Sequence, residues 1–281
     1  MQENVGEDLM NRPDLKMHVR LIGLPTDSHS SFLRGTAAAP PQIRAALASE
    51  HSNLATECGL ELGQEIIVDD LGDLPLDEST DDVGRIREAA ADAARAGVPV
   101  LFLGGDHMIS YPTVAGLAEV YGPLNILHFD AHTDLFDDFE GDPLSHASPF
   151  ARIMESGLAT RLVQVGIRQL NHHCREQVER FGVEVVEMRH FRADAVPIPD
   201  APLYVTIDLD ALDPAFAPGV SHHEPGGLSV RDIINVLHRI DVPIVGGDIV
   251  EYNSHRDVNG VTAVVAAKLL KELAALTAKR A

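Results

Sequence analysis

The sequence predicts an α/β protein built on an eight-stranded, mostly parallel sheet with helices on both of its faces. Eight short apolar or β-branched runs recur along the 281 residues. Stretches with apolar residues at helical spacing lie between many of them, and this alternation is typical of parallel sheets. The runs are continuously apolar instead of alternating with polar residues, which indicates strands buried on both faces.

The expected elements follow one another along the chain with short loops between them. The predicted strands are residues 19–25, 65–71, 98–105, 124–131, 162–168, 183–188, 203–210 and 243–250. The predicted helices are residues 83–97, 111–121, 174–181, 230–240 and 261–278. Each of these helical stretches carries apolar residues three and four positions apart, which places them on one face of a helix.

The chain reads as a single domain, because no Gly/Ser-rich or Pro-rich linker interrupts this alternation. We expect the domain to span residues 18–281 and residues 1–17 to form a flexible arm, by their polar composition. The arm has neither the apolar core of a signal peptide nor the Arg-rich composition of a transit peptide. No apolar run approaches the roughly 18 residues of a membrane span. We therefore expect a cytoplasmic protein with no membrane partner.

The chain is strongly acidic, with 43 acidic residues against 22 basic ones and a formal net charge of -21. Such a charge repels nucleic acids and anionic membranes, so we expect neither as a partner, and it favours small cationic ligands. Cys58 and Cys174 lie far apart without CxxC or zinc spacing. This argues against a disulfide framework or a thiolate metal site.

Acidic and imidazole side chains lie at the carboxyl ends of four of the predicted strands or directly after them. In parallel sheets, ligands bind beyond the carboxyl ends of the strands, so chemistry is expected at these positions. The residues are Asp106, His107, Asp130, His132, Asp134, Asp208, Asp210, Asp213 and Glu251. Side chains two positions apart on an extended chain point the same way. We therefore expect Asp130, His132 and Asp134 to converge on one point, and Asp208 to point the same way as Asp210.

A group of carboxylates of this kind requires positive charge, because like charges a few ångströms apart cannot all stay ionised. Carboxylate and imidazole ligands without a thiolate favour Mn²⁺ or a similar divalent ion, and bridging carboxylates favour two ions about 3.5–4 Å apart. Each motif alone has a plainer interpretation: DxHxD as a capped turn with a hydrogen-bonded histidine, and DxD as a capping loop. Their occurrence at separate strand ends favours the metal site.

Several segments resemble the ureohydrolases, which are the arginase and agmatinase family. They are GGDHMIS (104–110), DAHTD (130–134), SHASPF (145–150), DLDALDPAFAPG (208–219) and Glu251 in GGDIVEYN. The similarity extends over residues 19–273. Among these proteins the plant-type arginases are most similar, since they share segments like SSFLRG, FARIME and VAAKL with this sequence.

The resemblance implies a three-layer α/β/α sandwich, two Mn²⁺ ions per subunit, and a homotrimer or homohexamer. All six of the family's ligand positions carry matching residues. They are His107 and Asp134 on one ion, His132 and Asp210 on the other, and Asp130 and Asp208 bridging both. The ions would supply hydroxide at neutral pH for attack on a guanidinium carbon, and Asp134 would orient it.

Two further positions match residues that act on the substrate in this family. His146 matches a loop histidine proposed to pass a proton to the leaving amine, which suits an imidazole because it titrates near neutral pH. Glu251 would accept hydrogen bonds from the planar guanidinium in bidentate fashion. The plainer interpretations are a surface-loop histidine without a task and a carboxylate that caps the segment after its strand.

The positions for the substrate tail depart from those of animal-type arginases. Where those proteins grip the amino-acid end of arginine with Asn and Asp, this chain has Phe136 and Asn171, and His222 stands where many members have a Thr. Agmatine lacks the α-carboxylate and needs no such anchors, so this pattern slightly favours agmatine, hydrolysed to putrescine and urea. L-Arginine, hydrolysed to ornithine and urea, is the alternative, because plant-type arginases also lack these anchors.

Other functions are less consistent with the sequence. Guanidinobutyrate, guanidinopropionate and formiminoglutamate are further substrates of the same chemistry. A non-catalytic, oligomeric family member is a different class of function, and the intact ligands, His146 and Glu251 argue against it. A nucleotide-binding domain is a third class, but GLPTDSHSSFLRG after the first predicted strand contains no GxGxxG.

Overall fold

The described part of the computed structural model, residues 16–278, is organised around one eight-stranded sheet in which every neighbouring pair of strands is parallel. The strands are β1 Met17–Leu24, β2 Ile66–Asp73, β3 Val100–Gly104, β4 Leu124–Phe129, β5 Ala159–Ile167, β6 Glu184–Glu187, β7 Leu203–Asp208 and β8 Ile244–Val250. Each strand overlaps one predicted run, so the predicted fold class is confirmed. Residues 1–15 of the predicted arm lie outside the described residues, and Met17 already belongs to β1.

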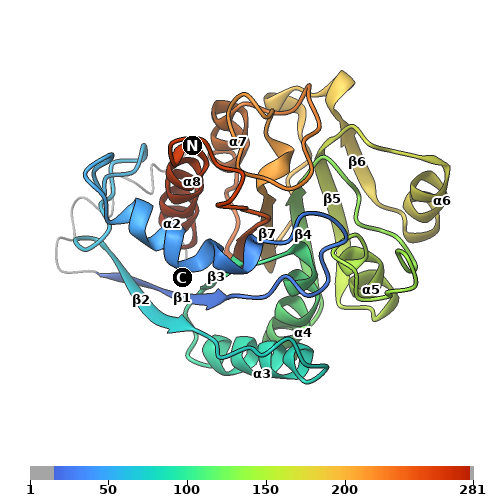
Figure 1. Cartoon of the computed structure of the whole chain (residues 1–281). Coiled ribbons are helices and arrows are strands. Elements are labelled where there is room, and N and C mark those ends of the chain that lie inside the picture. Colours follow the sequence, from blue (N-terminus) through green and yellow to red (C-terminus); the bar gives the residue numbers. More distant parts are fainter. Residues whose placement is uncertain (1–15, 279–281) are drawn as a thin grey trace, which may run out of the picture.

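Helices cover both faces of this sheet, which gives the three layers visible in Figure 1. The helices are α2 Ala39–Leu47, α3 Asp82–Ala94, α4 Ser110–Tyr121, α5 Pro149–Glu155, α6 His172–Phe181, α7 Val230–Leu237 and α8 Val261–Ala278. Helices α3 and α4 pack against each other on one face, and α2, α7 and α8 lie on the other. Five helices were predicted; α2 and α5 are the additional ones. None of the described helices combines the length and apolar character needed to cross a membrane.

Strand β3 shows why the strands read as continuous apolar runs. Leu101 and Leu103 belong to the core beneath α2 and α8, whereas Val100 and Phe102 belong to the core beneath α3 and α4. All four side chains are at most 2 % exposed. Because successive side chains of a strand point to opposite faces, a strand between two helical layers must be apolar at every position.

The order of the strands, β2-β1-β3-β8-β7-β4-β5-β6, places a crevice at the centre of the sheet. Strands β3 and β4 are consecutive in the chain, yet β8 and β7 lie between them. The chain leaves β3 and β4 towards the face that carries α4 and α5, whereas it leaves β8 and β7 towards the face that carries α8 and α7. Where neighbouring strands send their connections to opposite faces, a space opens beyond their carboxyl ends. All the predicted ligand positions lie at the ends of these four central strands.

Candidate active site

The central strands deliver the six predicted ligands into one cluster at this crevice. Two single-turn 3₁₀ helices carry two of them, His107 in η2 (His107–Ile109) and Asp210 in η5 (Leu209–Ala211). The turn into η2 requires glycine at position 105, because a Cβ there would lie 1.7 Å from the carbonyl oxygen of Thr26. Glycine thus lets the loop before His107 pass close against the loop after β1.

On one side of the cluster, three carboxylates surround the imidazole of His107. Its Nδ1 lies 3.2 Å from Oδ2 of Asp130, 3.0 Å from Oδ2 of Asp134 and 3.2 Å from Oδ2 of Asp208. Within the described residues this nitrogen nevertheless makes no hydrogen bond. Its other nitrogen, Nε2, lies 3.0 Å from Oγ1 of Thr206. The four atoms thus face a common point instead of pairing with one another, which is the arrangement of metal ligands.

The other side of the cluster is formed around His132. Its Nδ1 lies 3.3 Å from Oδ1 of Asp130 and 3.2 Å from Oδ2 of Asp210. Asp210 is oriented by the backbone N–H of Ala131, which donates to its Oδ1 at 3.2 Å. Asp130 consequently directs one oxygen towards His107 and the other towards His132, as a carboxylate shared by two ions would.

The electrostatics of the cluster demand cations. Burial raises the pKa of Asp208, and the charges of Asp210 and Asp130 raise it further. Burial lowers the pKa of His107 and of His132, but the carboxylates around them outweigh this and raise both pKa values well above the usual range. Oxygen and imidazole donors in a buried, strongly negative cluster fit hard or borderline divalent ions, so the residues present fit a two-metal centre.

Two residues of this region have strained backbones. Asp134 has φ +50° and Glu251 has φ +63°, both in the left-handed region that non-glycine residues rarely adopt. Such conformations cost on the order of 1–3 kcal/mol each and concentrate at functional sites. Asp134 lies in the loop after β4 and Glu251 directly after β8, and both side chains line the same cavity.

Beside the cluster, Glu251 and His146 form a buried pair. Oε1 of Glu251 accepts hydrogen bonds from Nδ1 of His146 at 2.8 Å and from the backbone N–H of His107 at 2.9 Å. Burial lowers the pKa of His146, but the charge of Glu251 outweighs it and, with Asp106, raises this pKa to about 9. On its far side, Nε2 of His146 lies 2.8 Å from Oγ of Ser31 and 3.2 Å from the backbone nitrogen of Ser31.

The two other acidic residues at strand ends lie apart from the cluster. Asp106 accepts a hydrogen bond from the backbone N–H of His29 at 3.0 Å, and burial together with the charge of Glu251 raises its pKa to about 7. Asp213 accepts from the backbone N–H groups of Ala215 and Gly226 at 2.9 and 2.7 Å. Asp213 therefore has a structural role in a loop.

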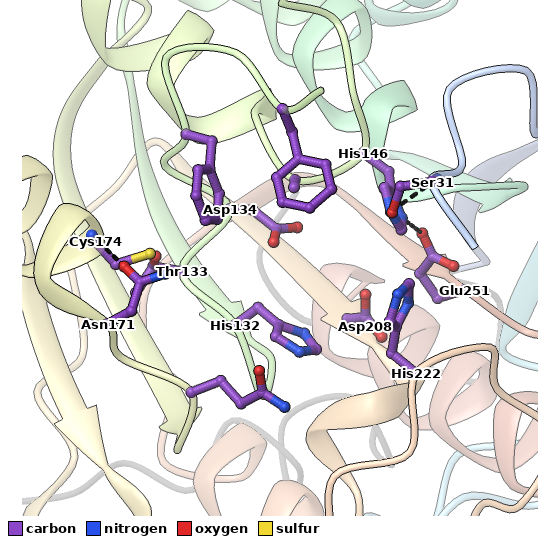
Figure 2. Close-up of a pocket in the computed structure, with 14 residues that line it drawn as sticks. Ser31, His132, Thr133, Asp134, His146, Asn171, Cys174, Asp208, His222 and Glu251 are labelled. Atoms are coloured by element: carbon purple, nitrogen blue, oxygen red, sulfur yellow. Dashed lines mark hydrogen bonds and ion pairs between the residues drawn. The ribbon is translucent and has the colours of Figure 1, made fainter. Parts of the chain in front are cut away.

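A cavity of about 240 Å³ opens over His132, Asp134 and Asp208 (Figure 2). The three residues predicted for the substrate pocket, Phe136, Asn171 and His222, all line it, as do the predicted catalytic residues Asp134, His146 and Glu251. Lining residues that the sequence did not single out include Ser31, Phe139, Gln169 and Cys174. In Figure 2, His222 lies opposite Asn171, with His132 between them.

Two of the residues that the sequence did not single out lie directly beside predicted site residues, and one of them carried a readable signal. His128 lies two positions before Asp130 on β4, so HFDAHTD is part of a longer every-second-residue pattern of polar side chains. It was concealed within an apolar run. Ser31 lies in a loop without regular structure, and only the fold brings it to His146, 115 positions away in the chain.

Comparisons with known proteins agree with this geometry. The model of the "Arginase family" matches residues 17–275. The chain belongs to the arginase family. It is 50% identical to "Arginase 1, mitochondrial" of Arabidopsis thaliana, over 94% of this chain and 82% of that protein. A solved structure of arginase from Medicago truncatula superposes with a TM-score of 0.87 at 45% identity, covering 97% of this chain and 91% of that one. A mitochondrial agmatinase of Gallus gallus is 34% identical, over 90% of this chain and 78% of that protein.

Membership of the arginase family confirms the resemblance to ureohydrolases and identifies the chain as a hydrolase of guanidino substrates. It does not support the slight preference for agmatine, because the arginases above are more similar to the chain than the agmatinase is. Family members depend on two metal ions, and the His and Asp clusters here are able to bind metal. A cytoplasmic location stays a prediction, since the Arabidopsis relative is named as mitochondrial.

Proposed function

We propose that the protein is an arginase, which hydrolyses L-arginine to L-ornithine and urea with two Mn²⁺ ions per subunit. The observation that carries this proposal is the 50% identity to a plant arginase over 94% of the chain, against 34% to an agmatinase. The expected substrate is therefore arginine and not agmatine, although Phe136 and Asn171 slightly favoured agmatine. Agmatine remains the second candidate.

The metal centre would use the six residues of the cluster. His107, Asp134 and Asp208 face one position, His132 and Asp210 face the other, and Asp130 faces both. Asp208, which was expected to bridge the ions as Asp130 does, directs Oδ2 towards His107, while its Oδ1 accepts from the backbone N–H of Asp210 at 2.7 Å. When bound, the two ions lower the pKa of water enough to provide a nucleophile at neutral pH and polarise the reacting group. Asp134 lines both the cluster and the cavity, so its carboxylate is in place to orient the attacking water.

Glu251 would hold the guanidinium. Its Oε1 is already an acceptor for two donors, His107 N–H and His146 Nδ1–H. Its Oε2 has no hydrogen bond to the described residues, and the side chain lines the cavity. A carboxylate oxygen held in this way offers a charge-assisted hydrogen bond to a planar cation and fixes its orientation.

His146 would supply the proton of the departing amine. Hydrolysis joins the oxygen of water to the guanidinium carbon, and the bond from this carbon to Nε breaks. Nε leaves as the side-chain amine of ornithine and needs a proton, while the carbon ends in urea. His146 is charged near neutral pH, because its pKa is raised to about 9, and it lies at the cavity wall. It is therefore able to donate at this step.

Two amides at the outer part of the cavity suit the amino-acid end of arginine. Oδ1 of Asn171 accepts from the backbone N–H of Cys174 at 2.9 Å as the cap of α6, so its NH₂ group is left as a donor for a carboxylate. Nε2 of Gln169 donates to Oε2 of Glu224, so Oε1 of Gln169 is left as an acceptor for an ammonium group. This pair of functions supports arginine over agmatine, which has no carboxylate.

Side-by-side kinetics with L-arginine and agmatine on Mn²⁺-loaded protein test the proposal. We expect kcat/KM for arginine to exceed that for agmatine at least about tenfold, which corresponds to about 1.4 kcal/mol of additional transition-state binding. Urea release should stop with a chelator and return with Mn²⁺. A higher kcat/KM for agmatine or for guanidinobutyrate would reassign the substrate. Light scattering would test the predicted homotrimer or homohexamer.

A further inference from the structure

His128 lies directly behind the carboxylate that both halves of the metal cluster share. It is fully buried on β4, and its Nε2 lies 2.8 Å from Oδ2 of Asp130. Its ring stacks on Phe150 with centroids 4.0 Å apart, and it lies edge-on to the ring of His107 at 5.0 Å. His128, His107 and Asp130 present donor atoms within 4.8 Å of one another, so position alone would also allow His128 to be a metal ligand.

The hydrogen bonds of Gln164 decide which nitrogen of His128 carries the proton. The terminal atom of Gln164 named Nε2 lies 2.6 Å from the carbonyl oxygen of Thr133. A carbonyl only accepts, so this atom must be the NH₂ group of the amide. The same NH₂ group lies 3.0 Å from Nδ1 of His128. Nδ1 is therefore an acceptor without a proton, and the proton of the neutral ring is on Nε2.

With its proton on Nε2, His128 donates to Asp130 and has no lone pair there to offer a metal. The opposite carboxylate oxygen, Oδ1, accepts from the backbone N–H of His132 at 2.6 Å. Asp130 is thus held from both ends, with Oδ2 kept facing His107 and Oδ1 kept facing His132. A hydrogen bond of this kind fixes the orientation of a ligating carboxylate, and its loss commonly weakens metal binding about 10- to 100-fold.

We propose that His128 is a positioning residue for the two-metal centre, which orients Asp130 through Nε2–H in a tautomer imposed by Gln164. This inference deepens the proposed function and rests on it, since it assumes that Asp130 bridges two ions. Nothing is needed from the substrate, so the role can be measured on metal binding alone.

Two matched variants of the full-length protein separate hydrogen bonding from packing. His128→Gln places an amide NH₂ close to the position of Nε2 and retains the donor. His128→Phe retains a ring against Phe150 and loses the donor. Each metal-free protein is titrated with Mn²⁺, and the electron paramagnetic resonance signal of free Mn²⁺ gives the Kd. Electron spin echo modulation of the bound ion reports how many imidazole nitrogens are coordinated, and melting of the metal-free proteins reports packing.

We expect His128→Phe to bind Mn²⁺ about 10- to 100-fold more weakly and His128→Gln to stay within about threefold of the wild type. The nitrogen modulation should be the same in the wild type and in His128→Gln. Wild-type affinity in His128→Phe would refute the positioning role, and a loss of one nitrogen coupling in His128→Gln would make His128 a ligand instead. If His128→Phe fails to fold, Gln164→Leu is measured in its place. This variant keeps the imidazole of His128 but removes the amide that fixes its tautomer. Unchanged Mn²⁺ affinity in Gln164→Leu would also refute the proposal. A wild type that binds no Mn²⁺ would refute the proposed function itself.

Discussion

Replacing Glu251 by Gln tests the central interaction of the proposed arginase reaction. The variant keeps an amide oxygen that can accept from His107 N–H and from His146 Nδ1–H, now 2.9 and 2.8 Å from Oε1. It replaces the other carboxylate oxygen by an NH₂ group. This group is a hydrogen-bond donor, so it cannot accept from the guanidinium, which also offers only donors. The substitution therefore removes the charge and reverses the hydrogen-bonding role at one atom, while the shape of the side chain stays the same.

The expected magnitude follows from the hydrogen bond that the variant cannot form. A hydrogen bond to a charged group contributes about 1.5–3 kcal/mol, and a donor that faces a buried donor costs about 1 kcal/mol more. We expect kcat/KM for arginine to fall about 10²- to 10³-fold, since each 1.4 kcal/mol is a factor of about ten. Mn²⁺ content should stay at the wild-type level, because Glu251 is not among the six cluster residues.

The assay is steady-state urea release with arginine, together with metal analysis and melting of the same preparations. Glu251→Asp is the matched control, since it keeps the charge and shortens its reach. A fall in kcat/KM of less than threefold in Glu251→Gln at full metal content would refute the assignment of Glu251 to the guanidinium. The same variant should also lower the pKa of His146, because the Glu251 charge is the main cause that raises it against burial.

Three further substitutions have defined outcomes. Asn171→Ser keeps a capping oxygen for α6 but loses the amide donor, so KM for arginine should rise about tenfold while KM for agmatine and the melting temperature stay unchanged; equal changes for both substrates would exclude a carboxylate contact. Asp130→Ala should lose both ions, because it serves both sides of the cluster; two ions per subunit by mass spectrometry would contradict this. The raised pKa of His146, about 9, is tested by comparing the urea-induced unfolding of the metal-free His146→Gln variant with that of the metal-free wild type. The extra stability of the wild type should be complete below pH 6.5 and lost as pH rises through about 9, because the folded state then no longer holds the additional proton; a constant difference would refute it.

The sheet was predictable because each buried strand is a short run of consecutive apolar residues, which can be read from the local sequence. A strand covered on both faces must be apolar throughout, as β3 is. All eight predicted runs became strands, including the partly exposed edge strands β2 and β6. Helices α2 and α5 were missed for a local reason too. Both carry proline in their first turn, in APPQIRAAL and PFARIME, and the prolines suggest a loop although proline suits the first turn of a helix.

The ligands were predictable because strand ends gather at one edge of a parallel sheet, whereas their supporting residues were not. His128 and Gln164 lie inside strands and are fully buried, so their sequence surroundings are those of core residues. Their roles depend on which atoms of neighbouring strands they meet. The same holds for the substrate tail: the sequence shows an amide at Asn171, but only the cap of α6 shows that its NH₂ group is the free end.

The charges of the site explain why its substrate should be a cation. Asp130, Asp134, Asp208 and Asp210 carry four negative charges, which two divalent ions would balance. Burial, followed by the charge of Glu251, raises the pKa of Asp106 to about 7, which brings this carboxyl group close to neutrality without a metal.

Oε1 of Glu251 is paired with His146, and its Oε2 is the oxygen that would accept from a guanidinium in the cavity. A neutral group of the same shape would offer fewer donors and no charge-assisted hydrogen bond to this oxygen, which contributes about 1.5–3 kcal/mol. L-Citrulline, whose ureido group is such an isostere, should therefore inhibit arginine hydrolysis with an inhibition constant at least about 100-fold above KM for arginine, and in Glu251→Gln this discrimination should largely disappear. Equal affinity for citrulline and arginine in the wild type would mean that charge at Glu251 does not select the substrate.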